Sequence, residues 1–233
     1  MSQLICRDVS LGYDGRVVCR HVDFCVDAGD YLCIVGDNGS GKSTLLKALL
    51  GLHAPISGEI VKGEGMGKGS IGYLPQQSEL QRDFPATVRE VTLSGCIGRL
   101  GRKFFYSNSD KLLAHDCMRR LGICDLADKP YSELSGGQQQ RTLLARSLCA
   151  AKKMILLDEP VSGLDPTATA EMYETIRSLN KDLGITVIMI THDVLAALRY
   201  ANCVLCMSDE PRFFRNVDEY KASLLEGSQG GAE

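Results

Sequence analysis

Eight consecutive residues, from Gly36 to Ser43, match the pattern GxxxxGK[ST] at every fixed position. In such a loop, glycines let backbone N–H groups turn inward and approach the oxygens of a polyphosphate closely. Lys42 can reach the β- and γ-phosphates, and the hydroxyl of Ser43 can ligate Mg²⁺. The pattern therefore predicts a phosphate-binding loop formed by Gly36, Asp37, Asn38, Gly39, Ser40, Gly41, Lys42, Ser43 and Thr44.

The segments on both sides of this loop have the composition that such a site needs. Residues 31–35 are apolar and predict a buried strand, while residues 42–51 predict a helix with Leu45, Leu46 and Leu49 on its inner side. Strand, loop and helix N-terminus together form an anion site, because the helix dipole adds a partial positive charge at its start.

A second group of residues has the chemistry of hydrolysis. The apolar segment 154–158 predicts a strand that ends in Asp158 and is followed directly by Glu159. The carboxyl ends of parallel strands are where such sheets bind their ligands. Asp158 can hold Mg²⁺ through its water shell, and Glu159 can act as the general base that polarises an attacking water.

A third group lies in the sequence Leu-Ser-Gly-Gly-Gln at 134–138. Ser135 followed by Gly136 and Gly137 predicts the start of a helix that runs to residue 150. This helix start offers a second set of N–H donors and a second positive dipole end. The chain therefore has two features suited to binding phosphate, of which only one is a phosphate loop.

The composition is that of a globular protein. The chain has 233 residues, of which 44% are apolar and 24% charged, and its net charge of −3 argues against a nucleic-acid partner. No apolar run approaches the ~20 residues that span a bilayer. Residues 1–7 lack the long apolar segment of a signal peptide. We therefore expect a cytoplasmic chain whose ten cysteines stay reduced.

Strands alternate with helices along the second half of the chain, which indicates a mostly parallel sheet with helices on its faces. A glycine-dense segment at 62–69 predicts a hairpin loop between two short strands. Thr87, with Glu90 three residues later, predicts a capping box. Further strands are predicted at 4–9, 22–26, 57–61, 70–74, 186–191 and 203–207, and helices at 88–94, 110–121, 167–183 and 194–200. We expect one domain over residues 1–226, with a helical part at about 85–150, and a disordered tail at 227–233.

In these motifs, from about residue 4 to residue 207, the sequence resembles the ATP-binding cassette (ABC) family, the motor subunits of ABC transporters. The resemblance implies the ABC ATPase fold: an α/β phosphate-loop NTPase core with a mostly parallel sheet, an antiparallel β subdomain and an inserted helical subdomain. Seven motifs carry it, in the family's order: Tyr13, the loop 36–43, Gln76 after a strand, the signature 134–138, the pair Asp158–Glu159, the loop 162–165 and His192.

The resemblance implies a role for each motif, with ATP and Mg²⁺ as the ligands. Tyr13 would stack on adenine, Gln76 would meet Mg²⁺ or the attacking water, and His192 would hydrogen-bond the γ-phosphate and orient Glu159. Ser43, Gln76 and Asp158 would form the Mg²⁺ site. In a homodimer, Asp165 would bridge the two copies, and the signature residues Ser135, Gly136, Gly137 and Gln138 would complete the partner's phosphate loop.

Within the family, residues 84–95 look like the cassettes of zinc and manganese importers. This likeness implies an ATP-hydrolysing subunit, peripheral on the inner face of the cell membrane, that serves separate permease subunits and, indirectly, an extracytoplasmic substrate-binding protein. Two alternatives remain open: a transporter ATPase for another cargo, such as an iron chelate or a vitamin, and a soluble ABC ATPase outside transport.

The segment that follows Gln76, as far as residue 106, is the expected docking region for the permease. Phe104, Phe105 and Tyr106 stand beside three basic residues, a composition that suits a partner surface. The alternative is that this amphipathic loop covers the chain's own helical subdomain.

Overall fold

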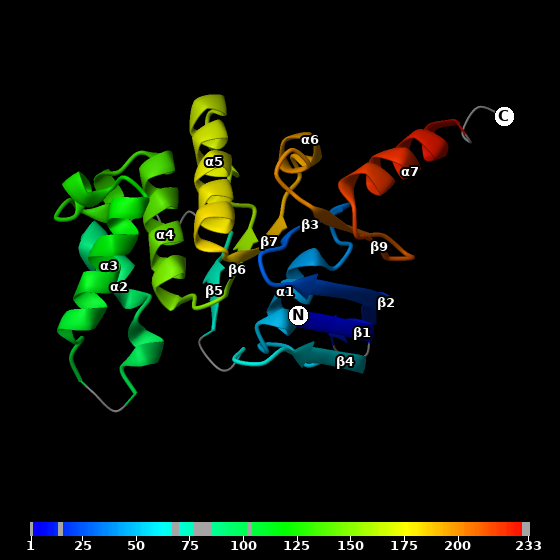
Figure 1. Ribbon diagram of the computed structural model, residues 1–233, viewed down its shortest axis with the longest axis horizontal. Helices are drawn as coiled ribbons and strands as arrows, with labels where there is room; N and C mark the ends of the chain where they lie inside the picture. Colours follow the sequence, from blue (N-terminus) through cyan, green and yellow to red (C-terminus); the bar gives the residue numbers. More distant parts are fainter. Residues whose placement is uncertain (1, 14–15, 67–69, 77–84, 102–103, 230–233) are drawn as a thin grey trace. The chain divides into compact units, whose positions relative to one another are not determined.

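The computed structural model describes residues 2–13, 16–66, 70–76, 85–101 and 104–229. The chain divides into two compact units, one made of Met1–Glu64 with Thr186–Glu233, and the other of Gly65–Ile185 (Figure 1). The predicted single domain over residues 1–226, with its helical part at about 85–150, stays a prediction.

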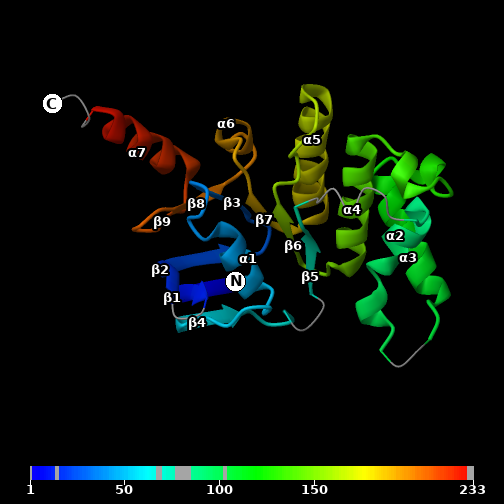
Figure 2. The same ribbon diagram turned by 180° about the vertical axis from the view of Figure 1, so that it is seen from behind.

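The first unit contains an antiparallel sheet of β1 (Ser2–Tyr13), β2 (Arg16–Asp27) and β4 (Ser57–Lys62), in the order β2-β1-β4 (Figure 2). Alternate residues of β2, namely Val22, Phe24 and Val26, are buried, as expected for a sheet with one covered face. Both long strands extend beyond the segments 4–9 and 22–26 that the sequence pattern indicated.

The first unit also contains the strand that leads into the phosphate loop. β3 (Tyr31–Gly36) pairs in parallel with β7 (Thr186–Ile190) and β8 (Cys203–Met207), and β9 (Arg212–Phe214) is antiparallel to β8. β3 and β7 are buried from Tyr31 to Val35 and along all of β7. Such continuous apolar burial is typical of parallel strands covered on both faces.

The helices of the first unit are α1 (Lys42–Leu49), α6 (Val194–Ala197) and α7 (Val217–Gln229). The sequence pattern predicted α1 and a longer α6 but missed β9 and α7. α7 includes the first three residues of the segment that was expected to be a disordered tail, and residues 230–233 lie outside the described part of the chain.

The second unit contains two parallel strands, β5 (Ile71–Leu74) and β6 (Met154–Asp158). Its α-helices are α2 (Val88–Ser94), α3 (Asn108–Arg120), α4 (Gly136–Ala150) and α5 (Pro166–Leu183), and short 3-10 turns lie at Ile97–Arg99, Cys124–Leu126 and Tyr131–Glu133. The predicted capping box at Thr87 and Glu90 is confirmed, and Ser107 with Asp110 and Ser135 with Gln138 form two more.

The predicted hairpin around residues 62–69 is wrong. β4 pairs with β1 in the first unit, whereas β5 pairs with β6 in the second, so the two strands are not partners. The physical reason is visible in their burial: every residue of β5 is buried or half-buried, whereas the first half of β4 is exposed. Glycine content indicates a turn but does not decide which strands pair across it.

Candidate functional site

The phosphate loop connects β3 to α1 within the first unit. Gly41 is the N-cap of α1, has a left-handed backbone conformation (φ 94°), and provides no side chain to cap the helix. The first N–H groups of an α-helix have no partner within the helix. An N-terminus that lacks a side-chain cap is therefore suited to an anion.

Gly36, the last residue of β3, allows the chain to turn into this loop. Its φ is +146°, and a Cβ atom placed there would lie 2.2 Å from the carbonyl oxygen of Met207, its partner in β8. No other residue type fits this approach without displacing one of the two strands.

Lys42 places a buried cation inside the loop. Its side chain is 6% exposed, and Nζ donates hydrogen bonds to the carbonyl oxygens of Gly36 (2.7 Å) and Asp37 (2.6 Å). The hydroxyl of Ser40 is buried and has no hydrogen-bond partner. A cation and an unsatisfied hydroxyl beside uncapped N–H groups fit the phosphates of a nucleotide, whose oxygens accept hydrogen bonds from all of them.

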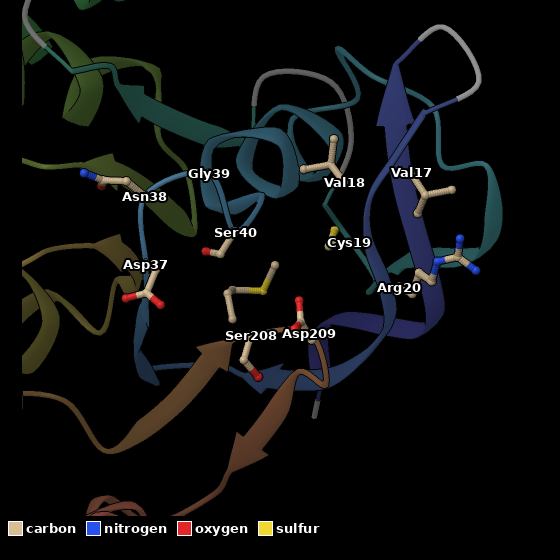
Figure 3. A pocket seen from close by; sticks show the side chains of 11 residues that line it. Val17, Val18, Cys19, Arg20, Asp37, Asn38, Gly39, Ser40, Ser208 and Asp209 are labelled. Atoms are coloured by element: carbon tan, nitrogen blue, oxygen red, sulfur yellow. The ribbon is translucent and has the colours of Figure 1, made fainter.

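Two cavities border the loop within the first unit. One has a volume of about 490 Å³ and lies between the loop at Asp37 to Ser40, β2 at Val17 to Arg20, and the turn at Asp209 (Figure 3). The other has a volume of about 470 Å³ and includes His192 together with Asp37 and Asn38. The structure thus brings the predicted His192 to the phosphate loop.

Tyr13 is not among the residues that line these two cavities. It ends β1 with a side chain that is 42% exposed, and its ring centroid lies 4.5 Å from that of His53. The adjacent residues 14–15 lie outside the described part of the chain. Stacking of Tyr13 on adenine stays a prediction.

The second unit holds the two acids at the end of β6. Asp158 is 5% exposed, and Tyr73 of the neighbouring strand β5 hydrogen-bonds to it. Burial, together with the negative charge of Asp158, raises the pKa of Tyr73 to about 12, so the phenol stays protonated and donates to the carboxylate. Tyr73 was not among the predicted site residues, because only the pairing of β5 with β6 brings it to Asp158.

Glu159 follows with a left-handed backbone conformation, φ 51°. Its Oε2 accepts a hydrogen bond from Nε2 of Gln76 at 3.0 Å, so the structure brings together two residues that lie 83 positions apart in the sequence. Gln77, the neighbour of Gln76 in the sequence, lies outside the described residues.

The signature residues surround a cavity of about 320 Å³ that also includes Asp165. The hydroxyl of Ser135 accepts a hydrogen bond from the backbone N–H of Gln138 at 3.4 Å, and Oε1 of Gln138 accepts from the N–H of Ser135 at 3.1 Å. Asp165 caps α5 by accepting from the N–H groups of Thr167 (2.9 Å) and Ala168 (3.0 Å). Signature and Asp165 thus form one polar depression within the second unit.

Each unit therefore contains part of the predicted site. Tyr13, residues 36–44 and His192 belong to the first, while Gln76, the signature, Asp158, Glu159 and Asp165 belong to the second. Neither unit places three His, Cys, Asp or Glu side chains where they could hold a metal among the described residues. All ten cysteines are free thiols, and Cys203 of the one CxxC pair is buried while Cys206 is partly exposed.

A strand, a glycine loop with a buried lysine and a helix start define a nucleotide-binding protein of the phosphate-loop class. The family model described as ABC transporter matches residues 19–162. The chain belongs to the ABC transporter family. None of the described helices is both long and apolar enough to cross a membrane.

Relatives and solved structures agree with this assignment. The zinc import ATP-binding protein ZnuC of Ruegeria pomeroyi is 35% identical over 95% of this chain and 84% of its own length. cbiO1 from Clostridium perfringens, part of the ABC transporter complex cbiONQ, is 29% identical, has a TM-score of 0.82, and covers 95% of this chain and 91% of its own. A dimeric ATP-binding cassette bound to ADP and Pi in a post-hydrolysis state is 25% identical, with a TM-score of 0.72 over 90% of this chain and 97% of its own. The predicted ABC ATPase fold is confirmed.

Proposed function

We propose that this chain is the ATP-hydrolysing subunit of an ABC transporter that imports a metal ion, with zinc or manganese as the expected cargo. The observation that carries the proposal is the carboxylate of Glu159, which directly follows the buried Asp158 and is held by Gln76. A zinc import ATP-binding protein that aligns with 95% of the chain supports the cargo. An iron chelate or a vitamin as cargo remains the alternative, because the residues of this subunit that face nucleotide carry no information on what the permease transports.

The nucleotide phosphates would be held by Lys42 and by the N–H groups that begin α1. Ser43, Asp158 and Gln76 would ligate Mg²⁺, which would neutralise charge on the β- and γ-phosphates. Asp158 suits this role because it is buried at the end of β6 and the protonated phenol of Tyr73 donates a hydrogen bond to it. Tyr13 would stack on adenine, and His192 would hydrogen-bond the γ-phosphate.

Glu159 would accept the proton of the attacking water. The hydrogen bond from Gln76 fixes the direction of its carboxylate, and a fixed base is more effective than a mobile one because its orientation costs no entropy during the reaction. Gln76 would thereby link the base to the segment that follows β5, which is where we expect the permease to dock.

Two copies of the chain would enclose two ATP molecules about a twofold axis. Ser135, Gly136, Gly137 and Gln138 of one copy would complete the phosphate loop of the other, and Asp165 would contact the partner copy. The dimeric cassette with ADP and Pi supports this arrangement. The buried phosphate charge would hold the dimer closed, and hydrolysis would release it.

The subunit would work at the inner face of the cell membrane with separate permease subunits and, through them, a substrate-binding protein. Phe104 and Phe105 are 93% and 85% exposed, which supports a partner surface rather than a loop that covers its own helical subdomain. The neighbouring Arg102 and Lys103 lie outside the described residues.

The test of the proposed function is Glu159→Gln, with Glu219→Gln as control, because Glu219 is an exposed carboxylate on α7. We expect Glu159→Gln to bind ATP as the parent does, to lower kcat by about 10²- to 10⁴-fold, and to accumulate as a dimer with ATP. Equal turnover of Glu159→Gln and Glu219→Gln would reject the base. The cargo is tested by ATPase stimulation in reconstituted permease: zinc- or manganese-loaded binding protein should stimulate, and stimulation only by an iron chelate or vitamin would reject metal import.

A further inference from the structure

Gln140 connects the helix that begins at the signature to the residue after Glu159. It lies on α4, four residues beyond the first helical residue Gly136. Its Nε2 donates a hydrogen bond to the carbonyl oxygen of Pro160 at 2.8 Å. We propose that Gln140 is a positioning residue that holds Glu159 in its working conformation. This inference rests on the proposed role of Glu159 as general base.

Glu159 needs such support because its backbone conformation is strained. Its φ of 51° is in the left-handed region, which residues with a Cβ atom rarely adopt. The next residue is Pro160, and a residue before proline is normally restricted to extended conformations. Conformations of this kind persist only where the surrounding structure enforces them, and they are frequent at active sites.

Hydrogen bonds from three different parts of the chain hold the segment. Gln76 binds the side chain of Glu159, and the backbone N–H of Ser162 donates to its carbonyl oxygen at 3.1 Å. Gln140 binds the following carbonyl, that of Pro160. Of these three donors, only Gln140 lies on α4, the helix that begins at the signature. Its hydrogen bond therefore connects α4 to the segment that holds the base.

The environment of Gln140 indicates that helix packing alone does not explain why a glutamine occupies this position. The residue is 1% exposed, and its Oε1 is buried without a hydrogen-bond partner. A buried acceptor without a partner is costly, and an apolar side chain of the same size would avoid that cost. The carbonyl of Pro160 needs a donor, which fixes the orientation of the amide with Nε2 toward it. The favourable feature of a glutamine here is therefore its contact with the segment of Glu159.

The contact has a consequence in the proposed dimer. The N-terminus of α4 would face the ATP held by the partner copy, whereas Glu159 would act on the ATP of its own copy. Gln140 would therefore let the base respond to the position of α4, so that hydrolysis is favoured when the signature helix is seated on the partner's nucleotide.

Gln139 provides a matched control for the experiment. It is the preceding residue of the same helix, it is 4% exposed, and its Nε2 also donates to a backbone carbonyl, that of Tyr131, at 3.1 Å. Methionine has nearly the size of glutamine but no N–H donor. Gln140→Met and Gln139→Met therefore each remove a buried hydrogen-bond donor from α4, and Gln140→Met removes the donor to Pro160, next to Glu159.

We expect Gln140→Met to lower kcat by about tenfold to a hundredfold with the KM for ATP within about twofold of the parent, since a displaced base slows the reaction without weakening binding. With ATP, Gln140→Met should accumulate as a dimer on gel filtration, while Gln139→Met should keep the parent's kcat and elution. Gln140→Leu, which also has no donor, is measured in parallel in case circular dichroism shows that Gln140→Met is unfolded.

The decisive comparison uses the Glu159→Gln background. If Gln140 acts through Glu159, adding Gln140→Met to Glu159→Gln should leave the residual turnover within about twofold, whereas independent effects would multiply. Multiplying effects, or a loss of kcat as large in Gln139→Met, would overturn the positioning role while leaving the base intact. Failure of the base itself would show separately, as full turnover of Glu159→Gln alone.

Discussion

Replacing Gly36 with alanine tests whether the strand end that precedes the phosphate loop is as tightly packed as the structure shows. The added Cβ would lie 2.2 Å from the carbonyl oxygen of Met207 and 3.0 Å from the hydroxyl oxygen of Ser40. The carbonyl of Gly36 also accepts a hydrogen bond from Lys42 at 2.7 Å. A shift of this residue therefore disturbs both the β3–β8 pair and the lysine of the loop.

The expected loss of stability has two parts. A residue with a Cβ atom costs about 1–2 kcal/mol in the left-handed region, and overpacking against a backbone oxygen costs about 1–3 kcal/mol. We therefore expect Gly36→Ala to lower the free energy of unfolding by about 2–5 kcal/mol, within the ~5–15 kcal/mol that a folded domain has available. The dissociation constant for ATP should rise about tenfold, equivalent to about 1.4 kcal/mol.

Gly29→Ala is the control, because Gly29 also has a positive φ (+82°) but its Cβ would meet no atom within 4 Å. It should lose only the conformational part, about 1–2 kcal/mol, and should bind ATP as the parent does. The chain has no tryptophan, so urea unfolding is followed by circular dichroism. The reasoning is refuted if Gly36→Ala is no less stable than Gly29→Ala and binds ATP equally well.

Two further predictions concern the helix caps and the pH dependence of stability. Ser107→Ala and Ser135→Ala each remove the cap of a capping box, so each should lower the free energy of unfolding in urea by about 1 kcal/mol. Only Ser135→Ala should weaken the ATP-dependent dimer. Equal dimerisation of the two variants would contradict a role of the signature in the interface. The hydroxyl of Ser2 and the guanidinium of Arg215 lower the pKa of Asp27. The ionised carboxylate therefore stabilises the fold at pH values above the ordinary aspartate pKa of about 4, and this contribution is lost as the pH falls through the lowered pKa. The stability difference between the parent and Arg215→Met should therefore be largest near neutral pH and shrink below about pH 4, and a difference that is constant with pH would contradict this account.

The sequence alone determined the features that are built from neighbouring residues, namely the phosphate loop and the capping box. The phosphate loop is contiguous, so its fixed positions identify it without any tertiary contact. The same holds for the capping box at Thr87, where the cap and its glutamate are three residues apart. The motif order also indicated the ABC family, which the match to residues 19–162 confirmed. The sequence analysis missed the short strand β9, because three residues show no clear period. It also missed the helix α7, although Asn216 with Glu219 three residues later is a helix-start signal, and the side chain of Asn216 accepts a hydrogen bond from the N–H of Asp218 at 2.8 Å.

Only the tertiary structure decided which distant residues meet. The contact of Tyr73 with Asp158 depends on the pairing of β5 with β6, and that of Gln140 with Pro160 depends on how α4 packs in the second unit. The hairpin prediction failed for the same reason, since glycines at 62–69 indicated a turn but not the partners of β4 and β5. Periodicity tells which face of an element is buried, but the choice of neighbour comes from the packing of all faces together, which no single segment contains.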